Sequence, residues 1–426
     1  MKKKMLISSL SDPTAEKKLE AIYKDAKAER TERIISLIDT FENTYGEGRD
    51  ISVYSVPGRS ELSGNHTDHN HGRVIAASID LDIIAVASPR DDGIIRIKSE
   101  GFPEDTVDIS LYTEPDKSRF GSSASLIAGM VAGFRSLGLR VGGFDACTTS
   151  NVLKGSGLSS SAAFEDMIGN ILNHLYNHGS VDNVEIAKLA QLAENKFFGK
   201  PCGLMDQVAC AVGGIVSIDF NDPKAPVIEK LDFDITGAGY RLCIVDTGGN
   251  HADLTPDYAA VPAEMKAIAK KFGKEVLRDV KEEDVLDNIM DLRTEFGDRA
   301  VLRALHFFAE NRRVKSQGDA LRSGDLRRYF DGVIASGRSS FCYLQNVYTT
   351  VNVKEQGLSL ALNLAERYLQ KLGGAYRVHG GGFAGTIQAY VPAAEVKGFC
   401  ALMDGVFGAG SSIPLCIRPI GATKIV

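Results

Sequence analysis

Residues 155–162 read Gly-Ser-Gly-Leu-Ser-Ser-Ser-Ala, and they constrain the fold of this 426-residue chain more than any other segment. The closely spaced glycines allow a tight turn, and the helix-forming run at 162–170 predicts that a helix starts directly after it. A turn at a helix N-terminus presents free N–H groups and the positive end of the helix dipole to an anion. A serine-capped helix without any ligand has the same pattern. Other motifs must therefore decide whether the segment binds phosphate.

Composition narrows the class of protein. The chain is too long for one hydrophobic core, which predicts two domains or one bilobal unit. Hydrophobic residues make up 44% and charged residues 24%, as in ordinary soluble proteins, and the net charge of −6 disfavours nucleic acid and membrane surfaces as partners. The seven cysteines are scattered, with no Cys-x-x-Cys pair. The apolar run after the basic N-terminus is too short for a signal peptide, so we expect a cytoplasmic protein.

Hydrophobic periodicity predicts strands and helices that alternate irregularly. Strands are expected at 51–56, 74–88, 94–99, 144–151, 241–246 and 386–391, and helices at 14–43, 125–137, 162–176, 184–198, 358–372 and 394–407. Pro57-Gly58 predicts the end of the first strand. Tight turns between neighbouring strands favour an α+β fold over a doubly wound parallel sheet. The pattern changes after residue 225, which predicts an N-terminal domain at 1–230 and a C-terminal domain at 231–426.

The loop at 57–72 concentrates polar side chains that carry chemistry. It contains three of the eight histidines, together with Arg59, Asp68, a threonine and two asparagines. Such residues are competent metal ligands, and they are also suited to hydrogen bonding the hydroxyls of a sugar or polyol. A solvated polar loop would have a similar composition. The loop alone leaves these three alternatives open.

Two further segments are candidates for a functional site. Residues 194–207 place Glu194 near a helix end and Asp206 among apolar neighbours. A carboxylate in apolar surroundings needs a charged or hydrogen-bonding partner, or it has a functional role. A capping or salt-bridging aspartate is the ordinary alternative. Residues 380–385, Gly-Gly-Gly-Phe-Ala-Gly, formally match the dinucleotide-binding pattern. A strand rather than a helix is predicted to follow, which excludes a Rossmann site and favours a close-packed glycine turn.

Taken together, these segments resemble the galactokinases, a family of the GHMP superfamily of small-molecule kinases. Four ordered segments carry the resemblance: 57–70, 155–162, 194–207 and 377–385. The resemblance covers the chain from about residue 41 to the C-terminus. It implies a two-domain GHMP kinase fold with the active site in the cleft between the domains. It also implies that a final strand returns to the N-terminal domain.

The resemblance further implies an ATP-dependent kinase that phosphorylates the anomeric C1 hydroxyl of galactose. Asp206 would accept the hydroxyl proton, and Arg59 would stabilise charge on the reacting oxygens. Mg²⁺ on ATP would be held by Ser161 and Glu194. The implied sugar-binding residues are Asn65, His66, Asp68, Gly203 and Tyr258. The implied phosphate-binding residues are Gly155, Ser156, Gly157, Leu158, Ser159, Ser160 and Ser161. The partners are then a small-molecule sugar and ATP, with a monomer or weak homodimer expected.

Several positions depart from the family pattern. Where galactokinases have Asn-Leu-Ile-Gly-Glu, this chain has Glu-Leu-Ser-Gly-Asn at 61–65, and the family's glutamate contacts the C6 hydroxyl. This loss of an acid, with His69, His71 and Arg73 nearby, suggests a related substrate such as galacturonate or another hexose derivative. The alternative is that these basic side chains face solvent.

The nucleotide site also departs from the family. The chain has no tryptophan, so the family's adenine-stacking residue is absent, and Phe120 is a candidate substitute. A non-catalytic sensor of sugar and ATP on the same fold is a further alternative. The retention of Arg59, Glu194 and Asp206 disfavours it.

Overall fold

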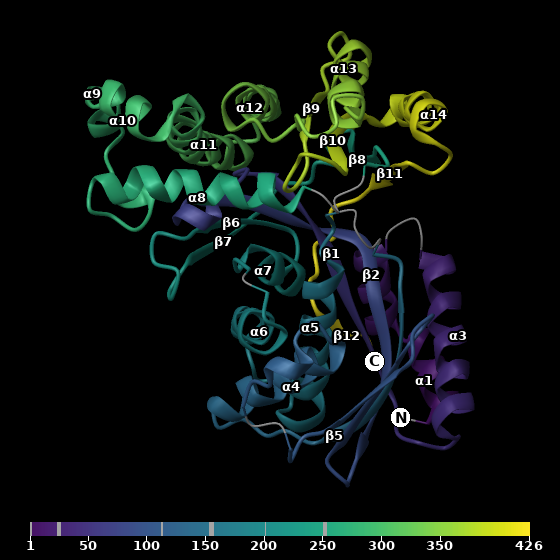
Figure 1. The fold of residues 1–426 in the computed structure, drawn as a ribbon. Coiled ribbons are helices and arrows are strands. Elements are labelled where there is room, and N and C mark those ends of the chain that lie inside the picture. Colours follow the sequence, from purple (N-terminus) through teal and green to yellow (C-terminus); the bar gives the residue numbers. More distant parts are fainter. Residues whose placement is uncertain (1, 24–26, 112–113, 153–156, 201, 250–253) are drawn as a thin grey trace.

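The computed structural model describes residues 2–23, 27–111, 114–152, 157–200, 202–249 and 254–426, and it contains two β-sheets in this part of the chain (Figure 1). The larger sheet has the strand order β12-β1-β2-β5-β3-β4, and β6 and β7 extend it from β2. Its strands are β1 (Ser52–Ser63), β2 (Arg73–Arg90), β3 (Ile94–Ser99), β4 (Glu104–Asp108), β5 (Gly143–Ser150), β6 (Ile215–Asp219), β7 (Val227–Leu231) and β12 (Thr423–Lys424). Strands β3 and β5 pair in parallel, whereas the other described pairs are antiparallel. This is the expected α+β architecture.

Strand β1 continues through Pro57-Gly58, so the prediction that these residues end it is wrong. Its pairing with β2 shifts register between Pro57 and Arg59, and irregularities of this kind are where a strand tolerates proline. Gly58 is needed there because a Cβ atom would lie 2.7 Å from the carbonyl oxygen of Leu158. Arg59 N donates to the same oxygen at 3.1 Å. The glycine/serine segment therefore packs directly against β1.

Helices cover both faces of this sheet (Figure 1). One face carries α4 (Ser123–Ser136), α5 (Ser160–Tyr176), α6 (Asn183–Leu192) and α7 (Met205–Val212), and the other carries α1 (Lys3–Leu10), α2 (Pro13–Tyr23) and α3 (Lys27–Tyr45). The helix expected at 14–43 is two helices, with 24–26 outside the described residues, and α1 was not predicted. The helix expected at 184–198 changes to π-helical geometry over Ala193–Phe198.

The second sheet has the order β11-β8-β10-β9, formed by β8 (Tyr240–Asp246), β9 (Ala375–Val378), β10 (Thr386–Pro392) and β11 (Ser412–Leu415). Helices α13 (Gly357–Leu369) and α14 (Val396–Phe407) pack on it. The helices α8 (Thr255–Lys271), α9 (Glu282–Asp287), α10 (Ile289–Phe296) and α11 (Asp298–Arg322) pack on one another. Helix α12 (Leu326–Ser339) packs against both α11 and β9, and it runs into a π-helical segment, Ser340–Leu344. The short 3-10 helices are η2 (Asp68–Asn70), η3 (Lys117–Arg119), η5 (Leu277–Asp279) and η7 (Ala393–Glu395).

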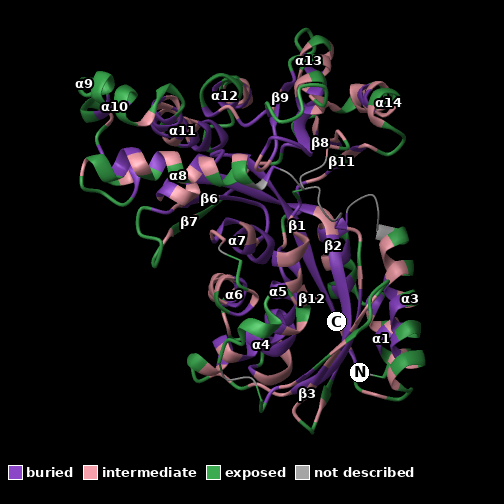
Figure 2. Cartoon of the chain, viewed as in Figure 1, coloured by how far each residue is buried: buried purple, intermediate pink, exposed green. Residues whose placement is uncertain are grey.

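The glycine-rich stretch at 380–385 joins β9 to β10, so a strand follows it, as expected. Strand β1 is buried from Val53 to its end, and the paired strand β2 is buried except at its two ends and at Asp80 and Leu81 (Figure 2). No helix in the described ranges combines the length and the apolar character that crossing a membrane requires.

The chain end returns to the larger sheet, where β12 pairs antiparallel with β1 (Figure 1). Near this return, the wholly buried Asp82 of β2 accepts hydrogen bonds from residues near both ends of the chain. Its carboxylate accepts from Tyr23 Oη and Arg33 Nη1, each at 2.6 Å, and from Arg418 Nη1 at 3.3 Å. Arg418 is also wholly buried, so loss of either Asp82 or Arg418 would leave the other as a buried charge with less compensation.

Candidate active site

Arg59 and Asp206 form the centre of the site, although 147 positions separate them in the sequence. Arg59 lies on β1 and Asp206 in the first turn of α7. The guanidinium donates two parallel hydrogen bonds, from Nε to Oδ1 and from Nη2 to Oδ2, both at 2.7 Å. Its Nη1 also donates to the carbonyl oxygen of Gly157, and Ser159 Oγ donates to Asp206 Oδ2 at 2.5 Å. The predicted acid, the predicted cation and the glycine/serine segment therefore meet at one place.

The environment of Asp206 keeps its carboxyl ionised. Burial acts to raise its pKa, but the charge of Arg59 and the hydrogen bonds from Arg59 and Ser159 outweigh burial and hold the pKa below its usual value of 3.8. The side chain is still 33% exposed, so a ligand can reach it. Asp206 therefore presents a negatively charged hydrogen-bond acceptor at neutral pH.

A cavity of about 210 Å³ opens beside this pair. It is lined by Arg59 and Asp206 and by all five predicted sugar-binding residues: Asn65, His66, Asp68, Gly203 and Tyr258. Glu61, His69, Lys200 and Gly381 also line it. Its size and its polar lining suit a small polyhydroxylated ligand.

Glycines bring the walls of this cavity close together. At position 203, a Cβ atom would lie 2.8 Å from Asp68 Oδ2, and at position 381 it would lie 2.4 Å from the ring of Tyr258. The glycine-rich stretch therefore serves close packing of the cavity wall, which was the favoured interpretation of 380–385.

His66 is held as a neutral donor. Its Nε2–H donates to the carbonyl oxygen of Gly381 at 2.9 Å, and its ring lies 5.3 Å from that of Tyr258. Burial, with a smaller contribution from His69, lowers the pKa of His66 to about 4. At neutral pH the ring is therefore uncharged, and its unprotonated Nδ1 can accept a hydrogen bond from a sugar hydroxyl without adding charge to the cavity.

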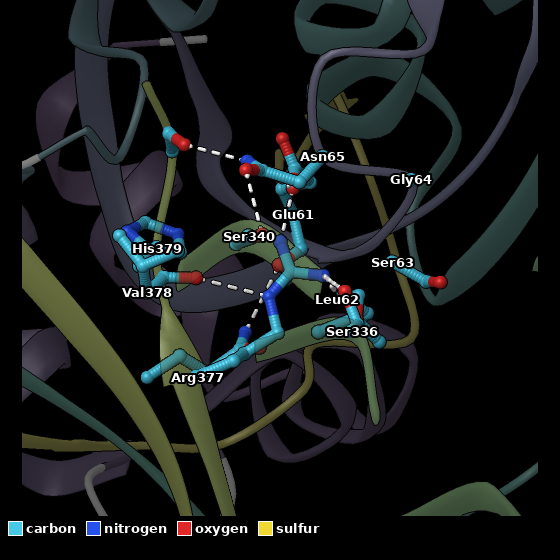
Figure 3. Close-up of polar contacts among 12 residues, drawn as sticks. Glu61, Leu62, Ser63, Gly64, Asn65, Ser336, Ser340, Arg377, Val378 and His379 are labelled. Atoms are coloured by element: carbon cyan, nitrogen blue, oxygen red, sulfur yellow. Dashed lines mark hydrogen bonds and ion pairs between the residues drawn. The ribbon is translucent and has the colours of Figure 1, made fainter. Parts of the chain in front are cut away.

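Asn65 is held by its neighbours rather than left open to the cavity (Figure 3). Its Oδ1 accepts from Ser340 Oγ at 3.2 Å and from Asn346 Nδ2 at 2.8 Å. Its Nδ2 donates to the carbonyl oxygen of Gly380 at 2.7 Å and to Glu61 Oε1 at 3.3 Å. The loop that carries the predicted sugar-binding residues is thereby tied to the C-terminal part of the chain.

Glu61 and Arg377 are the main residues that the sequence prediction missed. Arg377 is 1% exposed and forms an ion pair with Glu61, 316 positions away (Figure 3). The sequence does contain one indication of a role for Glu61, because the acid and the amide at 61 and 65 are exchanged relative to the family pattern. What could not be read from the sequence is that an arginine from β9 lies against the displaced acid.

The basic residues that suggested a uronic acid substrate do not all lie at the cavity. His69 lines the cavity. Arg73 instead forms a 2.8 Å ion pair with Asp219 on β6, and His71 ends the 3-10 helix η2 with a left-handed backbone. The alternative interpretation, in which Arg73 does not serve the site, is the one that the contacts favour.

The predicted phosphate loop is described from Gly157 onward; Gly155 and Ser156 lie outside the described residues. Leu158 is buried, Ser159 precedes α5 with φ +61°, and Ser160 and Ser161 begin that helix. Ser160 and Ser161 also line a second cavity, of about 690 Å³, together with Val152, Phe102, Phe164 and Phe198. An apolar, aromatic cavity at the start of a helix is suited to a nucleotide base with its phosphates at the helix N-terminus.

The candidate substitute for the missing tryptophan lies elsewhere. The ring of Phe120 packs on Gly199, where a Cβ atom would come within 2.1 Å of it. Among the phenylalanines that line the second cavity, Phe102 is the most exposed, at 47%.

The predicted Mg²⁺ ligand Glu194 lies beside a second buried acid, Glu165. Glu194 is 3% exposed, and it accepts from Lys200 Nζ and from Gln207 Nε2, both at 2.9 Å. Gln207 Nε2 also donates to the buried Glu165 at 3.3 Å, and Glu165 Oε1 has no partner among the described residues. Two carboxylates with one unpaired oxygen fit a hard, oxygen-loving cation. Within the described ranges, no group of three or more His, Cys, Asp or Glu side chains is placed to hold a metal.

Comparison with known proteins identifies the family of this chain. Residues 39–89 match the galactokinase galactose-binding signature, and residues 131–214 match the N-terminal domain of GHMP kinases. The galactokinase of Streptomyces coelicolor is 32% identical over 400 residues, which is 91% of this chain and 97% of that protein. The galactokinase of Actinobacillus pleuropneumoniae serotype 5b is 32% identical over 366 residues, covering 84% of this chain and 89% of that protein.

Solved structures give the same fold. The structure of Lactococcus lactis galactokinase complexed with galactose superposes with a TM-score of 0.78 at 24% identity, covering 92% of this chain and 100% of that one. The mevalonate kinase of Methanococcus jannaschii gives a TM-score of 0.62 at 14% identity, covering 86% and 98%. Because the sequence similarity to curated galactokinases spans nearly the whole chain, this protein belongs to the galactokinase family and has the GHMP kinase fold.

Proposed function

We propose that this protein transfers the γ-phosphoryl group of ATP to the anomeric C1 hydroxyl of galactose, which yields galactose 1-phosphate and ADP. One observation carries the proposal: the Arg59–Asp206 pair lies between a polar cavity and the glycine/serine start of α5. A phosphoryl acceptor and its donor would meet there. Family membership supports the same reaction.

The reaction needs positioning and charge more than covalent chemistry. The ionised Asp206 would accept a hydrogen bond from the C1 hydroxyl and direct its oxygen at the γ-phosphorus. As that oxygen bonds to phosphorus, the bond to the β-phosphate oxygen breaks and ADP leaves with its electron pair. The hydroxyl proton passes to Asp206 late in a loose transition state. Arg59 would neutralise charge that develops on the transferring oxygens.

Ser161 and Glu194 are the residues that we propose hold Mg²⁺ on the nucleotide. Bound Mg²⁺ neutralises phosphate charge and fixes the phosphates in one geometry. The serine lies in the first turn of α5, and the buried carboxylate of Glu194 already accepts from the cationic Lys200. Glu194 is thus arranged to face positive charge.

We also propose that residues 1–230 and 231–426 are separate domains. Strand β7 of the larger sheet ends at Leu231, and β8 begins the second sheet at Tyr240. In this division β12 crosses back to the first domain, since it pairs with β1.

The nucleotide cavity gives a prediction about ATP. Replacing Phe102 with alanine is expected to raise KM for ATP about 5- to 150-fold with little change in kcat, because stacking of a base on an aromatic ring contributes about 1–3 kcal/mol. Phe120→Ala is the matched control and should raise KM less, since its ring packs on Gly199. Initial rates at saturating galactose measure both variants. A larger effect from Phe120→Ala would mean that the stacking residue is misassigned.

Sugar-dependent ADP release tests the proposed function. We expect ADP to form from ATP and Mg²⁺ only when galactose is present, and to form much more slowly with galacturonate. Binding of sugar and ATP without ADP release would identify a sensor instead. Preferential turnover of galacturonate would contradict the choice of substrate.

A further inference from the structure

This inference rests on the proposed function and concerns how the sugar is recognised. We propose that Glu61, rather than residue 65, supplies the carboxylate that holds a sugar hydroxyl. Relative to the family pattern, the acid has moved from the end of the 61–65 segment to its beginning, and the amide has moved the other way. The acidic contact to substrate is therefore retained, but it comes from strand β1 instead of from the loop that follows this strand.

The first argument is that Asn65 has no hydrogen-bonding capacity left. A carboxamide has two N–H donors and two lone pairs on its oxygen. Asn65 uses both donors, on Gly380 and Glu61, and its oxygen accepts two hydrogen bonds, from Ser340 and Asn346. It is also 1% exposed. Its role is to fasten the loop to the C-terminal part of the chain, not to contact substrate.

The second argument is that Glu61 does have capacity. It lines the same cavity as Arg59 and Asp206. Both hydrogen bonds that its carboxylate receives from the described residues, from Arg377 and Asn65, reach Oε1. The other oxygen, Oε2, receives none from these residues and is not among the buried oxygens that lack a partner. A hydroxyl in the cavity can therefore donate to Oε2.

Arg377 makes this assignment specific, because it holds Glu61 in one place (Figure 3). The guanidinium donates to the carbonyl oxygen of Val378 at 3.0 Å and to Ser336 Oγ at 3.3 Å as well as to Glu61. Because several hydrogen bonds hold the guanidinium of Arg377 in place, it fixes the position of the Glu61 carboxylate. Arg377 is thus a positioning residue, and it offsets the charge of Glu61 in a buried place.

The consequence concerns which sugars are accepted. The negatively charged Oε2 of Glu61 attracts a sugar hydroxyl and repels the carboxylate of a uronic acid. The suggestion that loss of the acid at 65 admits a uronic acid therefore fails on this arrangement. We infer that the cavity selects a neutral sugar with a hydroxyl directed at Glu61.

Deoxy sugars test the inference. kcat/KM is measured for galactose and for its 2-, 3-, 4- and 6-deoxy analogues with the wild type and with Glu61→Gln. The wild type should disfavour at least one analogue by about 10- to 150-fold, as expected for a lost hydrogen bond to a charged group. In Glu61→Gln that same discrimination should shrink to about tenfold or less, because the acceptor is neutral.

Two further variants separate recognition from folding. Glu61→Asp keeps the charge beside Arg377 but withdraws it from the cavity, and it should weaken the same discrimination. Asn65→Ala is the matched control, and it should lower kcat/KM for all five sugars by one common factor. Discrimination that is unchanged in both Glu61 variants, or abolished by Asn65→Ala, overturns the inference. If the wild type does not phosphorylate galactose at all, the proposed function itself fails.

Discussion

Asp206→Asn is expected to lower kcat by about 10²- to 10⁴-fold, the usual contribution of a positioned general base. Asparagine has the same shape and can still accept from Arg59, but it carries no negative charge to orient the sugar hydroxyl or receive its proton. ATP is proposed to bind at the start of α5 through residues other than Asp206, so its dissociation constant should change little. Steady-state kinetics and calorimetric titration with a non-hydrolysable ATP analogue measure the two quantities.

The control for Asp206→Asn is Asp219→Asn. Asp219 lies on β6, where it pairs with Arg73 and Arg278, and it does not line the sugar cavity. Its loss should therefore leave kcat within about twofold of wild type. A kcat for Asp206→Asn that is equally close to wild type would contradict the proposed role. Loss of folded protein in this variant would recast Asp206 as a structural residue.

The depressed pKa of Asp206 adds a pH dependence. Its pKa in the folded state lies below the usual 3.8, so the carboxylate remains ionised as pH falls from about 8 to 5, and it should cause no loss of kcat/KM in that range. The stabilisation from its pair with Arg59 is present above the unfolded pKa and is lost as pH falls through the folded pKa. A base-limited decline centred between about pH 6 and 7 would mean that another group accepts the proton.

Asp82→Ala is expected to lower the free energy of unfolding by about 3–5 kcal/mol, because it leaves the buried Arg418 without its anionic partner. Tyr23 and Arg33 lose the same acceptor. Urea unfolding monitored by circular dichroism measures the change. Asp82 thus joins the N-terminal helices, β2 and the C-terminal return in one cluster.

An exposed ion pair provides the comparison for Asp82. Asp92 pairs with Arg90 at a turn and is half exposed, so Asp92→Ala should lower the free energy of unfolding far less than Asp82→Ala does. If Asp82→Ala and Asp92→Ala lower the free energy of unfolding equally, the buried cluster stabilises the protein no more than an exposed ion pair does.

The elements that carry motifs were predicted well because each motif lies within one short segment. Arg59, Asp206 and the start of α5 could be identified singly from neighbouring residues, and the resemblance to a family implied that they meet. The continuation of β1 through Pro57 could not be read locally. It depends on the register with β2 and on the packing of Leu158 against Gly58, which only the folded chain defines.

Contacts between distant polar residues were beyond prediction for a related reason. Periodicity reports which face of an element is buried, but it does not report the partner that a buried charge meets. Asp82 and Arg418 are 336 positions apart, and Glu61 and Arg377 are 316 positions apart. The choice between Phe120 and Phe102 at the nucleotide cavity likewise depends on Gly199, since its missing side chain accommodates the ring of Phe120.

The position of the transferred phosphoryl group tests the central claim most directly. The wild type is incubated with ATP, Mg²⁺ and galactose labelled with ¹³C at C1, and the product is observed by ¹³C and ³¹P NMR. A carboxylate at 206 that directs the anomeric hydroxyl predicts phosphorus coupling at C1 and one ADP for each sugar phosphate formed. Phosphorylation at another carbon, or ADP formation without a sugar phosphate, would contradict it.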